Sequence, residues 1–308
     1  MEIITLLDKF NIDNYRTGVA LGNFDGVHIG HQTLIVNLVE ICKNKNLKSV
    51  IYTFKNHPRK LTTDNGAPQK IISDKQKFKI LSEMGIDYLV FIDFDEYQRT
   101  LPPDKFVESI LSEKLRMAYA VVGFDYRFGY QAKGDIALLE ELEDIYSYQT
   151  TVIEPIKIQR ETISSTGIRE LIKASNINKA NLFLGRQYSI IGEVIQGRGL
   201  GKKFGFPTAN IQVQQDIILP SPGVYFTKCV VDDKIYYSIT NIGSNPTLGE
   251  NPISIETSIF NFNEDIYGKE LEILFYQRHR DEIKFKNIDE LIKQVQSDIE
   301  QAKKFFSV

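Results

Sequence analysis

The chain has 308 residues, of which 42% are hydrophobic and 25% are charged, and its formal net charge is -3 at pH 7. This composition is that of an ordinary globular protein, and the dispersed Lys and Arg residues leave no basic footprint for a nucleic-acid partner. The two cysteines, Cys42 and Cys229, lie far apart and indicate neither a disulfide framework nor a CxxC redox motif. Segment 1–10 lacks the basic start of a signal peptide, and no apolar run reaches the roughly 18 residues that span a membrane. We therefore expect a cytoplasmic protein with no membrane partner.

The first part of the chain alternates strand-like and helix-like segments. Apolar or β-branched runs predict strands at 19–21, 49–54, 87–94, 118–124 and 151–158. Helical spacing of apolar residues predicts helices at 30–42, 74–84, 102–115 and 136–146. This alternation indicates βαβ crossovers and a doubly wound α/β fold with a parallel sheet. Ligands of such folds bind beyond the carboxyl ends of the strands.

The pattern changes near residue 185. Short alternating runs separated by Gly, Pro and Asn predict the strands of a compact antiparallel β-barrel, at 188–195, 223–231, 234–242, 254–262 and 271–277. A final helix at 288–306 carries its apolar residues on one face and should pack against the barrel. We therefore predict two domains, 1–184 and 185–308.

Three glycines and two histidines lie at the first strand-to-helix turn, in LGNFDGVHIGH at 21–31. His28 and His31 fall in the first turn of the predicted helix. A helix N-terminus carries unpaired backbone donors and partial positive charge, and the glycines let the backbone approach a ligand closely, so the turn favours a polyphosphate. The alternatives are a zinc pair, which would more often be spaced i, i+4, and histidines that only cap the helix or pack locally.

Two further segments have features of phosphate sites. In ISSTGIR at 163–169, three hydroxyl residues stand before a predicted helix that begins at Arg169, where they are either phosphate ligands or ordinary N-caps. In QGRGLGKKFGFPTAN at 196–210, the spacing differs from that of a Walker A loop, although a basic glycine-rich loop can fold over phosphates. The alternative for its glycines is a β-turn with surface lysines. Thr208 and Asn210 are two residues apart, so an extended segment would present both oxygens to one hard cation such as Mg²⁺.

The string GNFDGVHIGH resembles the nucleotidyltransferases that carry an HxGH motif, and over its full length it is similar to the bacterial bifunctional riboflavin kinase and FAD synthetase family. The string GxxxGxxxGFPTAN resembles the riboflavin kinase signature. Segments that agree with this family, in the same order, are 163–169, 220–225, 241–247, 255–262 and 266–275. The chain departs from the family's usual Glu-x-His at Ser258, which follows Glu256 and Thr257, and from its usual Asp at Asn261.

This resemblance implies a Rossmann-like nucleotidyltransferase domain followed by a barrel kinase domain. The barrel would phosphorylate riboflavin to FMN, and the first domain would adenylylate FMN with ATP to give FAD and pyrophosphate. Mg²⁺ is expected for both reactions, with ATP, riboflavin and FMN as small-molecule partners and no obligate protein partner. The residues with implied catalytic roles are Glu256 as the base, and His28, His31 and Arg169 on the triphosphate.

The resemblance also implies three sets of ligand-binding residues. Those for ATP are Gly22, Asn23, Phe24, Gly30, Ser164, Ser165, Thr166, Gly197, Gly199, Gly201, Lys202, Gly205 and Pro207. Those for flavin are His57, Asp125, Arg127, Asn241 and Arg280. The metal ligands are Thr208 and Asn210.

Several alternatives stay open at this point. Asp125 and Arg127 are either ligands or an internal salt bridge at a strand end. Core packing is the expected role of Phe54, Phe124 and Phe128, with stacking on the isoalloxazine as the alternative. For the whole chain, the alternatives are another nucleotidyltransferase of the superfamily and a flavin or nucleotide sensor that performs no chemistry.

Overall fold

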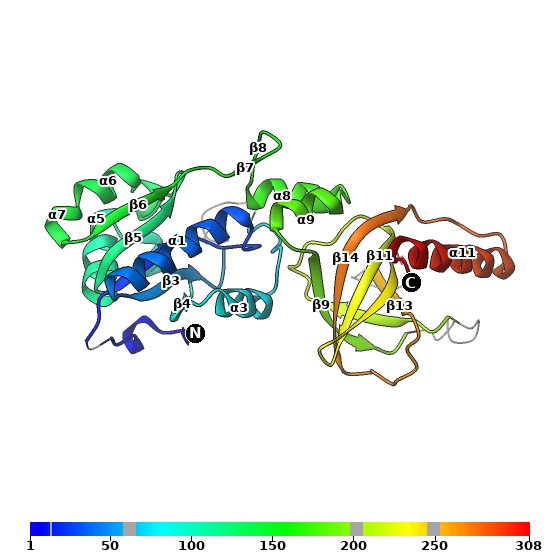
Figure 1. Ribbon diagram of the computed structural model, residues 1–308. Coiled ribbons are helices and arrows are strands. Elements are labelled where there is room, and N and C mark those ends of the chain that lie inside the picture. Colours follow the sequence, from blue (N-terminus) through cyan, green and yellow to red (C-terminus); the bar gives the residue numbers. More distant parts are fainter. Residues whose placement is uncertain (13, 58–65, 198–205, 245–252) are drawn as a thin grey trace. The chain divides into compact units, whose positions relative to one another are not determined.

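The computed structural model describes residues 1–12, 14–57, 66–197, 206–244 and 253–308 (Figure 1). The chain forms two compact units. The first unit comprises Met1–Gln69 and Asp74–Ser164, and the second comprises Lys70–Ser73 and Ser165–Val308. Within the described ranges, each helix is too short or too polar to cross a membrane.

The first unit is built on a parallel sheet of six strands in the order β1-β4-β3-β2-β5-β6. Their bounds are β1 Glu2–Ile4, β2 Thr17–Leu21, β3 Lys48–Phe54, β4 Tyr88–Ile92, β5 Met117–Gly123 and β6 Gln149–Ile153. Every residue of β2 and the five central residues of β3 are buried, which is the pattern of a sheet covered on both faces. The predicted doubly wound α/β fold is thus confirmed.

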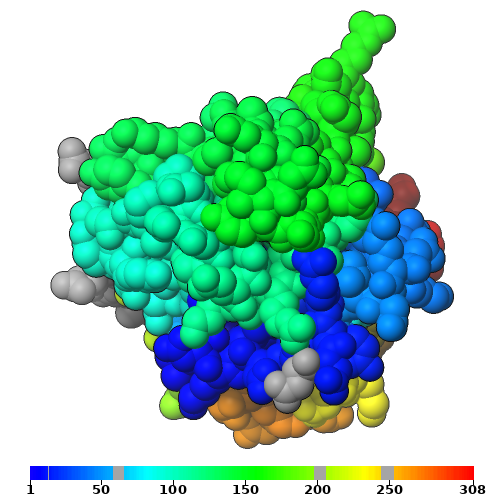
Figure 2. Space-filling view, turned by 90° about the vertical axis from the view of Figure 1, so that its left-hand side faces the viewer, coloured from blue at the N-terminus to red at the C-terminus, as the bar shows by residue number. Residues whose placement is uncertain are grey.

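One strand of this unit was missed, and one predicted strand is too long. The edge strand β1 was not predicted, because it has only three residues and two of them are exposed, so no periodic pattern marks it. The predicted strand 151–158 ends at Ile153, before Pro155. The chain then forms a small antiparallel hairpin of β7 (Lys157–Ile158) and β8 (Glu161–Thr162). Figure 2 shows this hairpin as a green projection from the surface.

The helices of the first unit follow the predicted segments with breaks. Their bounds are η1 Leu7–Lys9, α1 Ile29–Lys45, α3 Asp74–Glu83, α4 Glu96–Thr100, α5 Pro103–Lys105, η2 Phe106–Lys114, η3 Tyr130–Ala132, α6 Ile136–Glu141 and α7 Glu143–Tyr146. The predicted helix 102–115 starts as α5 and continues as the π-helix η2. The predicted helix 136–146 is interrupted at Leu142, which separates α6 from α7. The short helices η1, α4 and η3 were not predicted.

The second unit contains a closed antiparallel barrel of six strands in the order β10-β13-β12-β11-β14-β9. Their bounds are β9 Tyr188–Ile195, β10 Ala209–Val213, β11 Gly223–Val231, β12 Lys234–Ser244, β13 Ile253–Ile259 and β14 Glu270–Arg280. The predicted barrel is confirmed, and β9 and β11 begin and end where the alternating pattern placed them. Strand β10 was expected only as an extended segment.

In its described residues this unit also contains the helices α8 (Ser165–Lys173), α9 (Ile177–Leu184) and α11 (Ile288–Phe306). Helix α11 has the predicted bounds, starts at an Asn287 N-cap, and packs through Ala302 on the barrel side chains Val224, Phe226 and Ile239. Helix α8 begins at Ser165, earlier than the predicted start at Arg169. The two compact units divide at residues 164 and 165, and the functional boundary between 184 and 185 stays a prediction.

Candidate active sites

The two histidines of the first motif lie at the start of α1. His28 is the N-cap, and its Nδ1 accepts a hydrogen bond of 3.3 Å from the backbone N–H of His31. The two imidazole rings stack with centroids 3.7 Å apart and planes 15° apart. A Cβ at Gly30 would lie 3.2 Å from the His28 ring, so the absence of a side chain at Gly30 leaves room for the imidazole. The capping alternative therefore describes His28 in part, and the helix start places both rings side by side in its first turn.

The turn that leads to these histidines has an unusual backbone. Phe24, Gly26 and Val27 have φ angles of 48°, 79° and 37°. A β-branched residue with positive φ is an outlier, and such residues cost about 1–3 kcal/mol each unless the surroundings hold them. The Phe24 and Val27 side chains are both fully packed, and the Phe24 ring lies 5.2 Å from that of His31. Backbone strain of this kind gathers at ligand-binding turns.

Residues that follow neighbouring strands meet at the carboxyl edge of the sheet. Asn23 follows β2 and His57 follows β3, and their side chains are 3.4 Å apart from Nδ2 to Nε2. The backbone oxygen of Asn23 also accepts a hydrogen bond of 3.0 Å from the buried ammonium of Lys77 in α3. Lys77 was missed, because helical periodicity treats a lysine as solvent-exposed. Asn23 and His57 therefore lie together at the edge where ligands of doubly wound folds bind.

The segment after β5 contains Arg127, Phe124 and Phe128, for which the sequence predicted a salt-bridge partner or core packing. Arg127 forms its salt bridge with Asp135, the N-cap of α6, over 2.8 Å, and not with Asp125. Core packing is confirmed for Phe128, which is buried, but it is wrong for Phe124, whose side chain is 45% exposed at the strand end. The sequence could not separate the two rings, because β5 ends at Gly123 and both rings lie in the irregular segment that follows, where no periodic pattern indicates burial.

The hydroxyl residues of the third motif lie around the start of α8. Ser164 precedes the helix, whereas Ser165 and Thr166 are its first two residues, so they are inside the helix rather than ahead of it as predicted. Arg169 lies one turn further along α8 and is half-buried. Residues 165–173 belong to the second compact unit.

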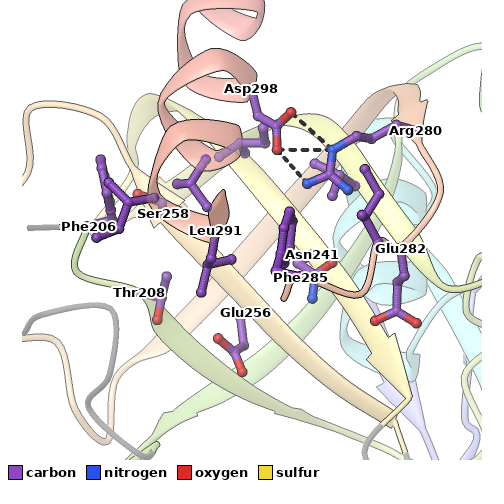
Figure 3. A pocket seen from close by; sticks show the side chains of 15 residues that line it. Phe206, Thr208, Asn241, Glu256, Ser258, Arg280, Glu282, Phe285, Leu291 and Asp298 are labelled. Atoms are coloured by element: carbon purple, nitrogen blue, oxygen red, sulfur yellow. Dashed lines mark hydrogen bonds and ion pairs between the residues drawn. The ribbon is translucent and has the colours of Figure 1, made fainter. Parts of the chain in front are cut away.

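The barrel carries a cavity of about 310 Å³ between the outer faces of β12 and β13 and helix α11 (Figure 3). Glu256 of β13 lies in it, directly opposite Asn241 on β12 and Asn210 on β10 in the strand register. Three candidate residues from distant segments therefore form one row across neighbouring strands. Residues directly opposite each other in an antiparallel pair share a face of the sheet.

The glycine-rich segment at 196–210 is described only before residue 198 and after residue 205, and both described parts lie near this site. Thr208 lines the cavity, whereas Pro207 beside it is exposed. A Cβ at Gly197 would lie 2.1 Å from Nδ2 of Asn210, so any larger residue there would force the amide of Asn210 to move. The predicted ATP residues Gly199, Gly201, Lys202 and Gly205 lie outside the described residues.

Comparisons with known proteins identify both halves. The family model for FAD synthetase matches residues 11–167, and that for riboflavin kinase matches residues 184–306. A bifunctional riboflavin kinase/FMN adenylyltransferase from Buchnera aphidicola is 34% identical over 100% of this chain and 100% of its own length. The chain belongs to this bifunctional family. Its members from Bacillus subtilis and Escherichia coli are 34% and 31% identical, over 95% and 94% of this chain and 93% of each relative.

A solved structure from Streptococcus pneumoniae, described as a macrolide-efflux protein, has a TM-score of 0.89 at 27% identity and covers 98% of this chain and 99% of that one. The likeness therefore extends over both halves of the bifunctional fold. The resemblance of the two sequence motifs to the family is confirmed, and the chain is a transferase with a riboflavin kinase half and an FMN adenylyltransferase half.

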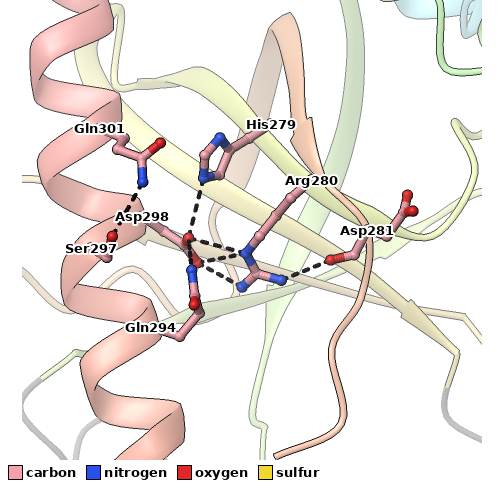
Figure 4. Close-up of polar contacts among 7 residues, drawn as sticks. All are labelled: His279, Arg280, Asp281, Gln294, Ser297, Asp298 and Gln301. Atoms are coloured by element: carbon pink, nitrogen blue, oxygen red, sulfur yellow. Dashed lines mark hydrogen bonds and ion pairs between the residues drawn. The ribbon is translucent and has the colours of Figure 1, made fainter.

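In the kinase half, Arg280 has a partner that the sequence did not reveal (Figure 4). Its Nη2 lies 2.6 Å from Oδ2 of Asp298 in α11, and the Asp298 side chain is only 3% exposed. Gln294 donates to the same carboxylate over 2.8 Å, and Nε2 of His279 lies 3.2 Å from it. Burial raises the pKa of Asp298, but the hydrogen bonds from Arg280 and Gln294 outweigh it, so this pKa lies below its usual value. Arg280 lines the cavity and also holds α11 to the barrel.

Other residues of the kinase cavity were also missed. They come from the chain around and within α11, namely Glu282, Ile283, Phe285, Leu291, Ile292, Val295 and Asp298. One signal was present in the sequence, because Asp298 interrupts the apolar face on which Val295 and Ala302 lie. An acidic residue at such a position indicates a buried partner. In the parts of the chain that the structure describes, no group of three or more His, Cys, Asp or Glu residues is placed to hold a metal ion.

Proposed function

We propose that the two halves catalyse consecutive reactions, in which FMN is the product of the first and the substrate of the second. The kinase half converts riboflavin and ATP to FMN, and the adenylyltransferase half converts FMN and a second ATP to FAD and pyrophosphate. The observation that carries the proposal is the row of Asn210, Glu256 and Asn241 across β10, β13 and β12, of which Glu256 and Asn241 line the barrel cavity. This row joins the candidate base to amides from two other motifs.

Glu256 is the base of the kinase reaction in this proposal. Phosphoryl transfer depends mainly on positioning and charge neutralisation, and the base takes the proton of the attacking hydroxyl. The ribityl 5'-oxygen forms a bond to the γ-phosphorus, the bond from that phosphorus to the β-phosphate oxygen breaks, and ADP leaves. Glu256 accepts the hydroxyl proton. Its half-buried position in the cavity, opposite Asn241, suits a polyol substrate that must be oriented by hydrogen bonds.

Thr208 and Asn210 provide the protein ligands for Mg²⁺ in the kinase half. A hydroxyl and an amide oxygen are hard donors of the kind that Mg²⁺ accepts alongside substrate phosphates. When bound, the ion would neutralise charge on the phosphates of ATP. Gly197 leaves room for the side chain of Asn210. The basic residues at 198–203 lie outside the described residues, and only the sequence resemblance assigns them to the ATP phosphates.

The adenylyltransferase half needs no protein nucleophile. The FMN phosphate is ionised at neutral pH, and its oxygen attacks the α-phosphorus of ATP while pyrophosphate leaves. His28 and His31 at the start of α1 bind the triphosphate, together with Arg169 and the hydroxyl residues Ser164–Thr166 from the third motif. Their work is to hold the phosphates and stabilise the charge that develops on the leaving group.

Residues near the carboxyl edge of the sheet are assigned to the nucleotide and the flavin. Asn23 serves ATP and its neighbour His57 serves FMN, with Asp125 and Arg127 as further flavin ligands. The exposed ring of Phe124 is available for stacking on an isoalloxazine at the end of β5. In this half Mg²⁺ is held mostly by the phosphates.

A chromatographic time course tests the whole proposal. Purified protein is given riboflavin, excess ATP and Mg²⁺, and FMN, FAD and pyrophosphate are measured separately. FMN should appear first, followed by FAD with pyrophosphate. A flavin sensor would bind the ligands without forming either product.

Two variants assign the reactions to their sites. His31→Ala should abolish FAD formation and leave FMN formation, whereas Glu256→Ala should abolish FMN formation and leave the adenylylation of added FMN. If either variant lost both activities while still folded, the assignment of two separate sites would be wrong.

A further inference from the structure

The inside of the barrel contains a connected chain of polar side chains directly behind the kinase cavity. Glu256 and Ser258 of β13 line the cavity, so Thr257 between them points to the opposite face, into the barrel. The members of this hydroxyl chain are at most 1% exposed, and they are Thr227 and Cys229 of β11, Ser238 and Thr240 of β12, and Thr257 of β13.

Each member of the hydroxyl chain bonds to the next. Cys229 Sγ donates to Ser238 Oγ over 3.2 Å, and the Ser238 and Thr227 hydroxyls are 2.8 Å apart. Thr227 and Thr240 are also 2.8 Å apart, and Thr240 and Thr257 are 2.6 Å apart. The interior of a small barrel is usually filled by apolar side chains, and buried polar groups are costly unless they are bonded. The hydrogen bonds of the hydroxyl chain therefore require one relative orientation of these side chains, which apolar packing would not impose.

The last bond of the chain lies beside the candidate base. Thr240 and Thr257 are directly opposite in the register of β12 and β13, and the next pair along these strands is Asn241 and Glu256. A slip of one residue would turn Glu256 away from the cavity and break the Thr240–Thr257 bond at the same time. One buried hydrogen bond thus stabilises the strand alignment that the kinase site uses.

We infer that Thr257 is a positioning residue for riboflavin phosphorylation, acting through its hydroxyl bond to Thr240 to hold Glu256 against the substrate hydroxyl. This inference rests on the proposed role of Glu256 as the base. A base must lie within hydrogen-bond reach of the proton that it takes, and a misplacement of about 1 Å can slow a reaction about 100-fold. Thr257 itself lies on the other side of the sheet and does not touch the substrate.

The test compares Thr257→Val, which removes the hydroxyl but keeps the shape, with Thr257→Ser, which keeps the hydroxyl. In the full-length protein, Thr257→Val should lower the kinase kcat by about ten-fold or more while the KM values for riboflavin and ATP change by less than about two-fold. Thr257→Ser should restore kcat to within about three-fold of wild type. Adenylylation of added FMN should be unchanged in both, which shows that the adenylyltransferase half is intact, and the unchanged KM values show that the barrel is folded.

Thr227→Val is the matched control, because it removes a hydroxyl from the same chain on β11, a strand that does not pair with β13. Its thermal unfolding should shift as much as that of Thr257→Val, but its kcat should stay close to wild type. If Thr227→Val slowed the kinase equally, the hydroxyl chain would serve only the stability of the barrel and the inference would be overturned.

A double-mutant comparison separates this inference from the assignment of the base. In a Glu256→Gln background there is no base left to position, so adding Thr257→Val should change kcat by less than about two-fold. The same factor in both backgrounds would overturn the positioning role while leaving the base assignment intact. If Glu256→Gln alone left kcat unchanged, the proposed base would be wrong, and the positioning role would be wrong with it.

Discussion

The buried ion pair between Arg280 and Asp298 gives the sharpest test of how α11 forms the wall of the kinase cavity. Asp298→Ala would remove a carboxylate that is 3% exposed and is bonded by Arg280, Gln294 and His279. The guanidinium of Arg280 would then lose its carboxylate and keep its bond to the backbone oxygen of Asp281, while its side chain stays mostly buried, with 18% exposure. Both the stability of α11 on the barrel and the shape of the cavity should suffer.

The expected loss follows from that burial. Removing one partner of a buried ion pair typically costs about 3–5 kcal/mol, because the other charge stays desolvated. Since Arg280 keeps some exposure, the lower end applies, and we expect a loss of about 3 kcal/mol in the free energy of unfolding. The matched control is Asp281→Ala. Its carboxylate pairs with Arg278 but is 80% exposed, so its loss should cost no more than about 1 kcal/mol.

Urea unfolding measures this difference. Circular dichroism is the suitable signal because the chain contains no tryptophan, and the urea midpoint of kinase inactivation reports on the barrel half. Asp298→Ala should also raise the KM for riboflavin, since α11 carries Leu291 and Val295 into the cavity, while adenylylation of added FMN should be unchanged. A destabilisation no larger than that of Asp281→Ala would refute the reasoning, because the pair would then behave as a surface contact.

The same pair predicts a direction of pH dependence. The pKa of Asp298 is lowered in the folded protein, so the pair contributes fully above the unfolded value of about 3.9 and its contribution is lost as the pH falls through the folded pKa. The difference in stability between wild type and Asp298→Ala should therefore be constant near pH 7 and shrink below about pH 4. A difference that grew on acidification would contradict the sign of this pKa shift.

Three further predictions concern the phosphate sites. Gly197→Ala places a methyl group 2.1 Å from Nδ2 of Asn210. The kinase KM for Mg-ATP should therefore rise about ten-fold, while FMN adenylylation is unchanged. An unaltered KM would mean that Asn210 does not serve ATP. Gly30→Ala crowds the His28 ring at 3.2 Å and should lower the rate of FAD formation from FMN without slowing the kinase, which steady-state assays of both steps would check. Removal of divalent cations with EDTA should stop both reactions, and added Mg²⁺ should restore them; turnover in EDTA would disprove the proposed metal requirement.

Local patterns in the sequence were sufficient to predict most elements of the fold. The alternation in β9 and β11 and the apolar face of α11 gave their bounds, because a turn or cap residue stands at an end of each pattern. Gly197 follows β9, Pro222 precedes β11, and Asn287 caps the start of α11. The strand β1 and the break at Leu142 were missed, since a three-residue strand has no period and a helix break without Pro or Gly leaves no local sign.

The partners of the site residues were harder to predict than their presence. The meeting of Asn210, Glu256 and Asn241 depends on the register of three strands, which no spacing along the chain specifies. The pairing of Arg127 with Asp135 likewise depends on where α6 starts. Sequence motifs therefore supplied candidate residues, whereas tertiary packing determined which of them touch.

The two departures from the family pattern have different physical consequences. Asn261 lies in the turn after β13 with a φ of 55°, a backbone conformation that Asn and Asp both adopt readily, so replacing the usual Asp preserves the turn. Ser258 lines the kinase cavity on the same face of β13 as Glu256. A serine there is smaller than the usual histidine and has no ring nitrogen, so the departure changes the space and the hydrogen bonding beside the proposed base. Any difference in kinase rate between this chain and its relatives should therefore be sought at position 258 before position 261.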